Sequence, residues 1–132
     1  MPNRPFVHIE FSASDPAKAA RFYGDLFGWE IHHMAEYDYW TFDNEPNHGG
    51  GFNTVGTNPS GFETKPGDVI AYVDVEDLDA SLTKAEELGA QVIQKRVDMP
   101  GMGAFAILRD PQSNLFGMWW TEPRAEGASA GA

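Results

Sequence analysis

The chain has 132 residues, the length of one ordinary domain, and 20 acidic against 9 basic side chains give it a formal net charge of −11. This balance argues against binding to nucleic acids or to anionic lipids, because both depend on clustered Lys and Arg side chains. The absence of cysteine excludes disulfides, thiolate nucleophiles and cysteine-ligated zinc or iron–sulfur sites.

The first half of the chain predicts one helix and four strands. Residues 1–5 have no apolar signal-peptide core, and no apolar run approaches the roughly 18 residues of a membrane span, so we expect a cytoplasmic protein. Phe6–Ser12 is typical of a strand, and Asp15 followed by Pro16 predicts a helix start. Gly28 predicts the helix end, and three strands are expected at residues 29–34, 37–42 and 50–55.

The second half repeats this order of elements. After the Pro- and Gly-rich segment Asn58–Gly67, residues 68–75 predict a strand, and Asp77 caps a helix that ends at Gly89. Three more strands are expected at residues 91–97, 104–108 and 115–120. A shift of 62 residues places Asp15 on Asp77. The pattern predicts a duplicated βαβββ module.

We therefore expect one structural domain made of two modules. Its parts are a first module at residues 1–57, a linker at 58–67, a second module at 68–121 and a disordered tail at 122–132. A repeat of roughly 60 residues is too long for a solenoid unit.

Side chains alternate along a strand, so the first strand of each module has two faces. Val7, Ile9 and Phe11 form a face that we expect to pack on the helix, whereas His8 and Glu10 lie on the other face. Both modules present a mixed polar and aromatic face away from the helix. These faces either enclose a half-polar cavity or form the solvent-exposed side of an antiparallel sheet.

Several short motifs occur in a fixed order from Phe6 to Trp120. They are the strand with His8, Ser14-Asp15-Pro16, Phe22-Tyr23, Phe27-Gly28-Trp29, Gly49-Gly50-Gly51-Phe52 and Arg109–Asn114. Together they resemble the vicinal oxygen chelate superfamily, which includes glyoxalase I, extradiol dioxygenases and bleomycin-resistance proteins. The resemblance implies an α+β fold in which two tandem βαβββ modules form a curled, cup-like mixed sheet with helices outside. It also implies a homodimer.

The resemblance further implies four metal-ligand positions, which fall on His8, Gly51, Ile70 and Gly117. Only His8 can ligate, whereas a divalent metal here needs about three protein ligands. We therefore expect no cofactor and no metal-dependent glyoxalase I or dioxygenase chemistry. The remaining imidazoles are His32, His33 and His48. Either one of them completes a rearranged metal site with His8 and Glu10, or they lie on the surface or on an edge strand.

His8 and Glu10 are the candidate catalytic residues. Because they are two positions apart on one strand, they share a face, and either form an acid–base pair or remain as polar core residues. The ligand-binding candidates are strand residues that line or widen a pocket: Tyr39, Trp40, Phe42, Gly51, Ile70, Tyr72, Gly117 and Trp119. Asp98–Gly103 joins two strands and forms either a mobile rim of the cavity or a plain hairpin loop.

The sequence favours a glyoxalase- or bleomycin-resistance-like protein that binds a flat or cationic small molecule without the usual metal. The alternative is a lyase, isomerase or dioxygenase-like enzyme that uses His8 and Glu10 or a rearranged metal site. A third hypothesis, an interaction module that pairs through its sheet edges, has no surface pattern that singles out a partner site.

Overall fold

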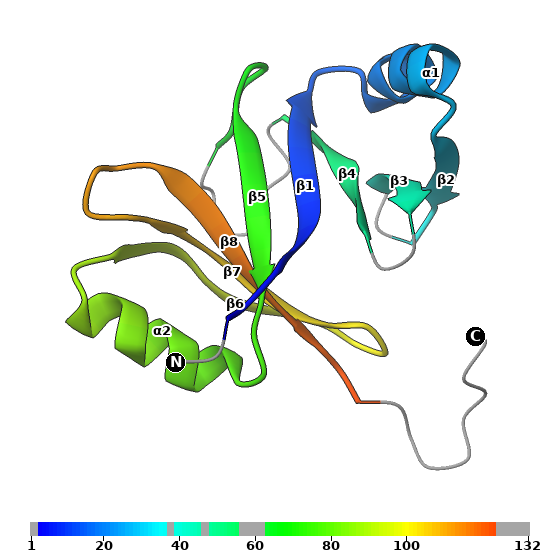
Figure 1. Ribbon diagram of the computed structural model, residues 1–132. Helices are drawn as coiled ribbons and strands as arrows, with labels where there is room; N and C mark the ends of the chain where they lie inside the picture. Colours follow the sequence, from blue (N-terminus) through cyan, green and yellow to red (C-terminus); the bar gives the residue numbers. More distant parts are fainter. Residues whose placement is uncertain (1–2, 37–38, 46–47, 56–62, 124–132) are drawn as a thin grey trace.

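The computed structural model describes residues 3–36, 39–45, 48–55 and 63–123 (Figure 1). The order strand–helix–three strands occurs twice, as the repeat predicts. The elements are β1 Phe6–Ala13, α1 Pro16–Phe27, β2 Glu30–Met34, β3 Tyr39–Glu45, β4 His48–Thr54, β5 Val69–Asp74, α2 Leu78–Glu87, β6 Gln91–Met99, β7 Gly103–Arg109 and β8 Leu115–Thr121. Parts of the expected linker and tail, residues 58–62 and 124–132, lie outside the described residues.

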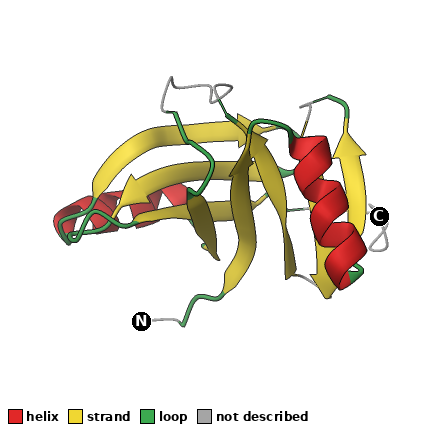
Figure 2. Ribbon diagram, turned by 90° about the horizontal axis from the view of Figure 1, so that it is seen from above, coloured by secondary structure: helices red, strands yellow, loops and turns green. Residues whose placement is uncertain are grey.

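The strands form one continuous sheet in the order β2-β3-β4-β1-β5-β8-β7-β6. β1 runs parallel to β4 and antiparallel to β5, and β5 runs parallel to β8, so the modules join along β1 and β5. The sheet curls, and α1 and α2 lie outside it at opposite ends of the molecule (Figure 2). The expected α+β fold with a cup-like mixed sheet is confirmed.

Both helices begin at the capping residues that the sequence indicates. The Asp15 side chain accepts a hydrogen bond from the backbone N–H of Lys18 at 3.2 Å, and that of Asp77 accepts one from Ala80 at 3.0 Å. Gly28 ends α1 at φ 72°, a left-handed conformation that costs glycine little. Within the described parts of the chain, no helix has the length and hydropathy to cross a membrane.

Strand alternation divides the apolar residues between the two sides of the sheet. One cluster of buried residues joins α2 to the sheet and consists of Val75, Leu78, Ala104, Ala106 and Leu108. Another joins α1 to the sheet and consists of Ala20, Phe42 and Phe52. A third cluster, Ile70, Tyr72 and Ile107, is packed together with partly buried Phe105 and Trp119. Full burial of a Leu side chain is worth roughly 1.5–3 kcal/mol, so Leu78 is the main apolar anchor of α2, whereas the buried residue of α1 is the smaller Ala20.

β1 departs from simple alternation near its start. Its pairing with β5 shifts register between Phe6 and His8, so two residues of β1 face one of β5. As a result Val7 lines the concave side of the sheet beside His8, which corrects the expectation that it packs on the helix. Phe11 does pack under α1, whereas Ile9 is 41% exposed.

Candidate functional site

The concave side of the sheet holds a cavity of about 770 Å³, within the size range of pockets for small molecules. Its lining residues come from all eight strands and from the turn between β6 and β7. One part of the wall is polar and includes His8, Glu10 and Asn53. Another part is aromatic, aliphatic and thioether and includes Met34, Met99, Met102, Phe105, Ile107 and Trp119.

Glu10 is the centre of the polar wall. Its Oε2 accepts a hydrogen bond from the Tyr39 hydroxyl at 2.6 Å. Its Oε1 accepts from Asn53 Nδ2 at 3.2 Å and, more weakly, from the Tyr72 hydroxyl at 3.5 Å. Donors from β3, β4 and β5 thus converge on one carboxylate of β1, which links the two modules through a polar contact.

His8 continues this network on the other side of Tyr39. Its Nε2 lies 2.9 Å from the Tyr39 hydroxyl oxygen. Because the only hydroxyl proton of Tyr39 is donated to Glu10, Nε2 must be the protonated nitrogen, and Nδ1 keeps a free lone pair. The His8 ring also meets the edge of Tyr72, with ring centroids 5.5 Å apart.

Burial controls the protonation of the polar wall. It lowers the pKa of His8 to about 4, so the imidazole is neutral near pH 7. Burial also raises the pKa of Glu10, although the hydrogen bonds from Tyr39, Asn53 and Tyr72 act in the opposite direction. The pKa values of both tyrosines lie well above the ordinary value, first through burial and then through the Glu10 charge, so both phenols keep their protons.

The cavity lining of the described chain contains three carboxylates and no Lys or Arg. Asp74 and Asp98 are paired with basic side chains: Arg4 Nη2 lies 2.7 Å from Asp74 Oδ2, and Arg96 Nε lies 2.9 Å from Asp98 Oδ1. Glu10 receives only neutral hydrogen-bond donors. It is therefore the carboxylate whose charge is least compensated.

Two of the implied metal-ligand positions are glycines covered by tyrosine rings. Gly51 pairs with Glu10 in parallel register, and Gly117 pairs with Tyr72 in the equivalent register of the second module. A Cβ atom added at Gly51 would collide with the Tyr39 ring, and one added at Gly117 would collide with the Tyr72 ring. The two rings occupy the space that ligand side chains would need at these positions.

The third position, Ile70, is fully buried against Tyr72 and Ile107 and offers no ligand atom. The fourth position is His8, whose Nε2 already forms a hydrogen bond with the Tyr39 hydroxyl. One imidazole does not fit a divalent metal that needs about three protein ligands.

Five of the candidate site residues line the cavity: His8, Glu10, Tyr39, Tyr72 and Trp119. Trp40 and Phe42 do not, which corrects that expectation. Trp40 stacks on His33 and Phe42 stacks on Trp29, each with ring centroids 4.3 Å apart. The physical reason is alternation along β3, where Tyr39 and Thr41 face the cavity and the residues between and beyond them face the helix side.

The sequence missed several lining residues. Strand alternation from Tyr39 and Trp119 could have found Thr41 and Thr121, but nothing local marks Asn53 or Phe105 as cavity residues. Three residues of the predicted rim segment 98–103 line the cavity: Asp98, Met99 and Met102.

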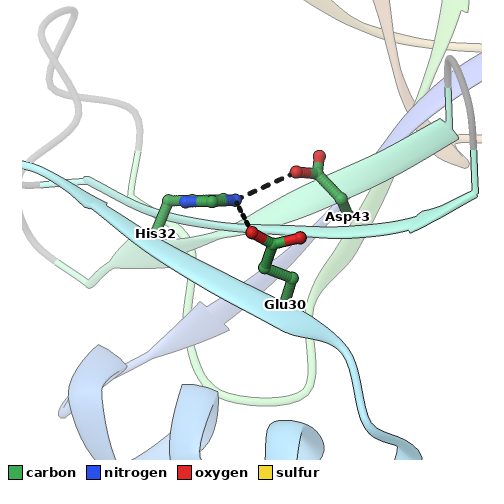
Figure 3. Close-up of side chains that lie close together, drawn as sticks. All are labelled: Glu30, His32 and Asp43. Atoms are coloured by element: carbon green, nitrogen blue, oxygen red, sulfur yellow. Dashed lines mark hydrogen bonds and ion pairs between the residues drawn. The ribbon is translucent and has the colours of Figure 1, made fainter.

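A separate group of potential ligand atoms lies at the β2–β3 edge (Figure 3). His32 Nε2 lies 3.1 Å from Asp43 Oδ2 and 3.6 Å from Glu30 Oε1, and all three side chains are exposed. None of them lines the cavity. His32 thus contacts these carboxylates rather than His8 and Glu10, and the side chain of His48 lies outside the described residues.

Comparisons with known proteins agree with this architecture. Over 53 residues, or 40% of the chain, the sequence is 42% identical to "Putative glyoxylase CFP32" of Mycobacterium bovis, and the match covers 20% of that protein. The chain thus spans about a fifth of the length of the curated relatives it matches.

Two solved structures share the fold at low sequence identity. Methylmalonyl-CoA epimerase from Mycobacterium tuberculosis has a TM-score of 0.65 at 12% identity, covering 89% of this chain and 88% of that one. A glyoxalase/bleomycin resistance protein/dioxygenase superfamily member from Vibrio splendidus has a TM-score of 0.61 at 13% identity, covering 91% and 100%. The family model described as "Glyoxalase-like domain" matches residues 8–118, and the chain belongs to this family.

Proposed function

We propose that this protein binds a small organic molecule in the concave cavity and does so without the divalent metal implied by the superfamily. The observation that carries the proposal is the cavity of about 770 Å³ with the Glu10 network in its wall. Gly51 and Gly117, two of the implied metal-ligand positions, are each covered by a tyrosine ring, which supports the metal-free part of the proposal.

The lining indicates the chemistry of the ligand. Aromatic and thioether side chains suit a flat, largely apolar molecule, because methionine adapts to irregular shapes. No basic side chain of the described lining would meet an anion, and the chain as a whole carries a net charge of −11. We therefore expect neutral or cationic ligands to bind in preference to anionic ones.

A matched series of tricyclic probes tests this proposal: 9-aminoacridine, acridine and acridine-9-carboxylate, followed by a wider fragment set. The cationic and neutral probes should raise the melting temperature, and the carboxylate should not. Thr41→Trp fills the cavity from β3 and should abolish the shift, whereas Thr83→Trp on the exposed side of α2 should leave it intact. Binding that survives Thr41→Trp, or a complete lack of binding, would refute the proposal.

Calorimetric titration with Ni²⁺, Zn²⁺, Mn²⁺ and Fe²⁺ tests the metal-free part. We expect no stoichiometric binding that depends on His8, because its position supplies one ligand only. Wild type is compared with His8→Ala and with His32→Ala, the latter removing the imidazole of the exposed β2–β3 group. Tight one-to-one binding that is lost in His8→Ala alone would return metal-assisted chemistry to this site.

A second candidate function is that of a small-molecule lyase or isomerase. The continuous hydrogen-bonded chain from His8 through Tyr39 to Glu10 favours it, because a plain binding pocket has no need to connect two titratable groups.

A further inference from the structure

The chain of hydrogen bonds between His8, Tyr39 and Glu10 has a definite direction while Glu10 is ionised. His8 Nε2–H donates to the Tyr39 oxygen over 2.9 Å, and the Tyr39 O–H donates to Glu10 Oε2 over 2.6 Å. No hydrogen-bond partner of His8 Nδ1 is found among the described residues, and the ring lines the cavity. The free lone pair of the imidazole is therefore available to a ligand.

The same three side chains can reverse this direction. If Glu10 is protonated, its O–H can donate to Tyr39, the Tyr39 O–H can donate to Nε2, and the imidazole proton then resides on Nδ1. No heavy atom needs to move, because every link keeps its donor–acceptor distance. The protonation state of Glu10 thus decides which nitrogen of His8 carries the proton.

We propose that Tyr39 joins His8 and Glu10 into a proton relay, in which His8 Nδ1 takes a proton from a bound carbon or hydroxyl acid and Glu10 receives it. This adds a proton-transfer activity to the binding site proposed above. The expected substrate class is a neutral or cationic molecule with an acidic C–H or O–H bond.

The transfer is balanced without a further reactant. The substrate X–H bond breaks and an Nδ1–H bond forms, while the Nε2–H bond breaks and a Tyr39 O–H bond forms. The original Tyr39 O–H bond breaks and a Glu10 O–H bond forms. The bonding electron pair stays on the substrate, so the negative charge moves from Glu10 to the substrate and His8 remains neutral.

The surroundings favour this route over direct protonation of His8. Burial lowers the pKa of His8 to about 4, which makes an imidazolium costly, and burial raises the pKa of Glu10, which favours its protonated form. Tyr72 and Asn53 also face Glu10, and both donate to Oε1, leaving Oε2 to Tyr39. The other ionisable side chains of the lining, Asp74 and Asp98, are paired with arginines.

The relay can be tested without a substrate by NMR of the ¹⁵N-labelled imidazole and the ¹³C-labelled Glu10 carboxyl across a pH titration. We expect the Nε2–H tautomer above the Glu10 transition and the Nδ1–H tautomer after Glu10 takes up its proton. The imidazolium should appear only near pH 4. An Nε2–H tautomer that persists through the Glu10 transition, or an imidazolium that forms together with it, would overturn the relay.

Two matched variants assign the link to Tyr39. Tyr39→Phe removes the hydroxyl that joins the two groups, and the tautomer change should be lost. Tyr72→Phe removes a hydroxyl that contacts Glu10 but not His8, and the change should persist. A change that persists in a folded Tyr39→Phe protein contradicts the proposal. The wild-type titration decides the question if that variant does not fold, and the ligand series above can fail or succeed independently.

Discussion

His8 is a neutral imidazole held between two tyrosine rings, and this enclosure determines how its protonation affects stability. Its pKa is about 4 in the folded chain against an ordinary value of 6.5. Between these values the unfolded chain binds a proton that the folded chain does not, so His8 lowers stability as the pH falls from about 6.5 to about 4. The full difference corresponds to roughly 3 kcal/mol as an upper bound.

The prediction is that His8→Gln flattens the pH dependence of stability in this range. Urea unfolding at pH 6.5 and pH 4.5 should show a smaller loss of unfolding free energy in His8→Gln than in wild type. Equal losses in both proteins would show that His8 is not enclosed.

Glu10 changes the unfolding free energy with pH in the direction opposite to His8. The effect of His8 therefore has to be measured by comparing wild type with His8→Gln. Its pKa is raised, so its stabilising contribution is present at low pH and is lost as the pH rises through the folded value. A wild-type profile alone would combine the two effects. The difference between wild type and His8→Gln isolates the imidazole.

Residue periodicity predicted part of this site and could not predict the rest. Spacing of two along a strand placed His8 and Glu10 on one face, and both line the cavity. The contact between Tyr39 and Gly51 depends on how β3 pairs with β4, which no local pattern specifies. The sequence shows only that the glycines at two ligand positions offer no ligand atom. In the folded chain a tyrosine ring occupies the space beside each of these glycines.

At the scale of single elements, the local sequence predicts where the helices begin and end, but it predicts less well which face of a strand a residue occupies. Asp15, Pro16 and Gly28 act at the ends of α1 through short-range hydrogen bonds and backbone conformation, so the sequence predicted these ends directly. The register shift in β1 carries no Gly or Pro signal, and it moved Val7 to the cavity side. Alternation along β3 also places Trp40 and Phe42 on the face opposite to Tyr39, where they pack toward α1.

Loss of a helix cap should weaken the core beneath the helix. Asp15→Ala removes the acceptor of the Lys18 N–H and should lower the unfolding free energy by about 0.5–2 kcal/mol, measured by urea unfolding. Asp25→Ala makes the same change near the C-terminal end of α1, where a carboxylate opposes the helix dipole, and should cost nothing or stabilise slightly. Equal destabilisation by both variants would mean that the cap is not the cause.

At the scale of the whole molecule, the duplicated sequence pattern corresponds to two halves of one sheet. The halves meet where β1 pairs with β5, and Tyr72 of the second half donates to Glu10 of the first. The pattern alone could not choose between an enclosed cavity and an exposed sheet face, because curvature arises from the pairing of distant strands. The homodimer and the cytoplasmic location stay predictions; light scattering tests the first and cell fractionation the second.

The shared sheet predicts that both halves unfold in a single transition. Trp29 and Trp40 report on the first half, and Trp119 and Trp120 report on the second. Fluorescence of Trp119→Phe/Trp120→Phe and of Trp29→Phe/Trp40→Phe should each follow the far-UV circular dichroism of the same variant during urea unfolding. Fluorescence that precedes or trails the circular dichroism would show that the modules unfold separately. Because the Glu10 network needs residues from both halves, separate unfolding would also mean that the cavity opens before the chain as a whole unfolds.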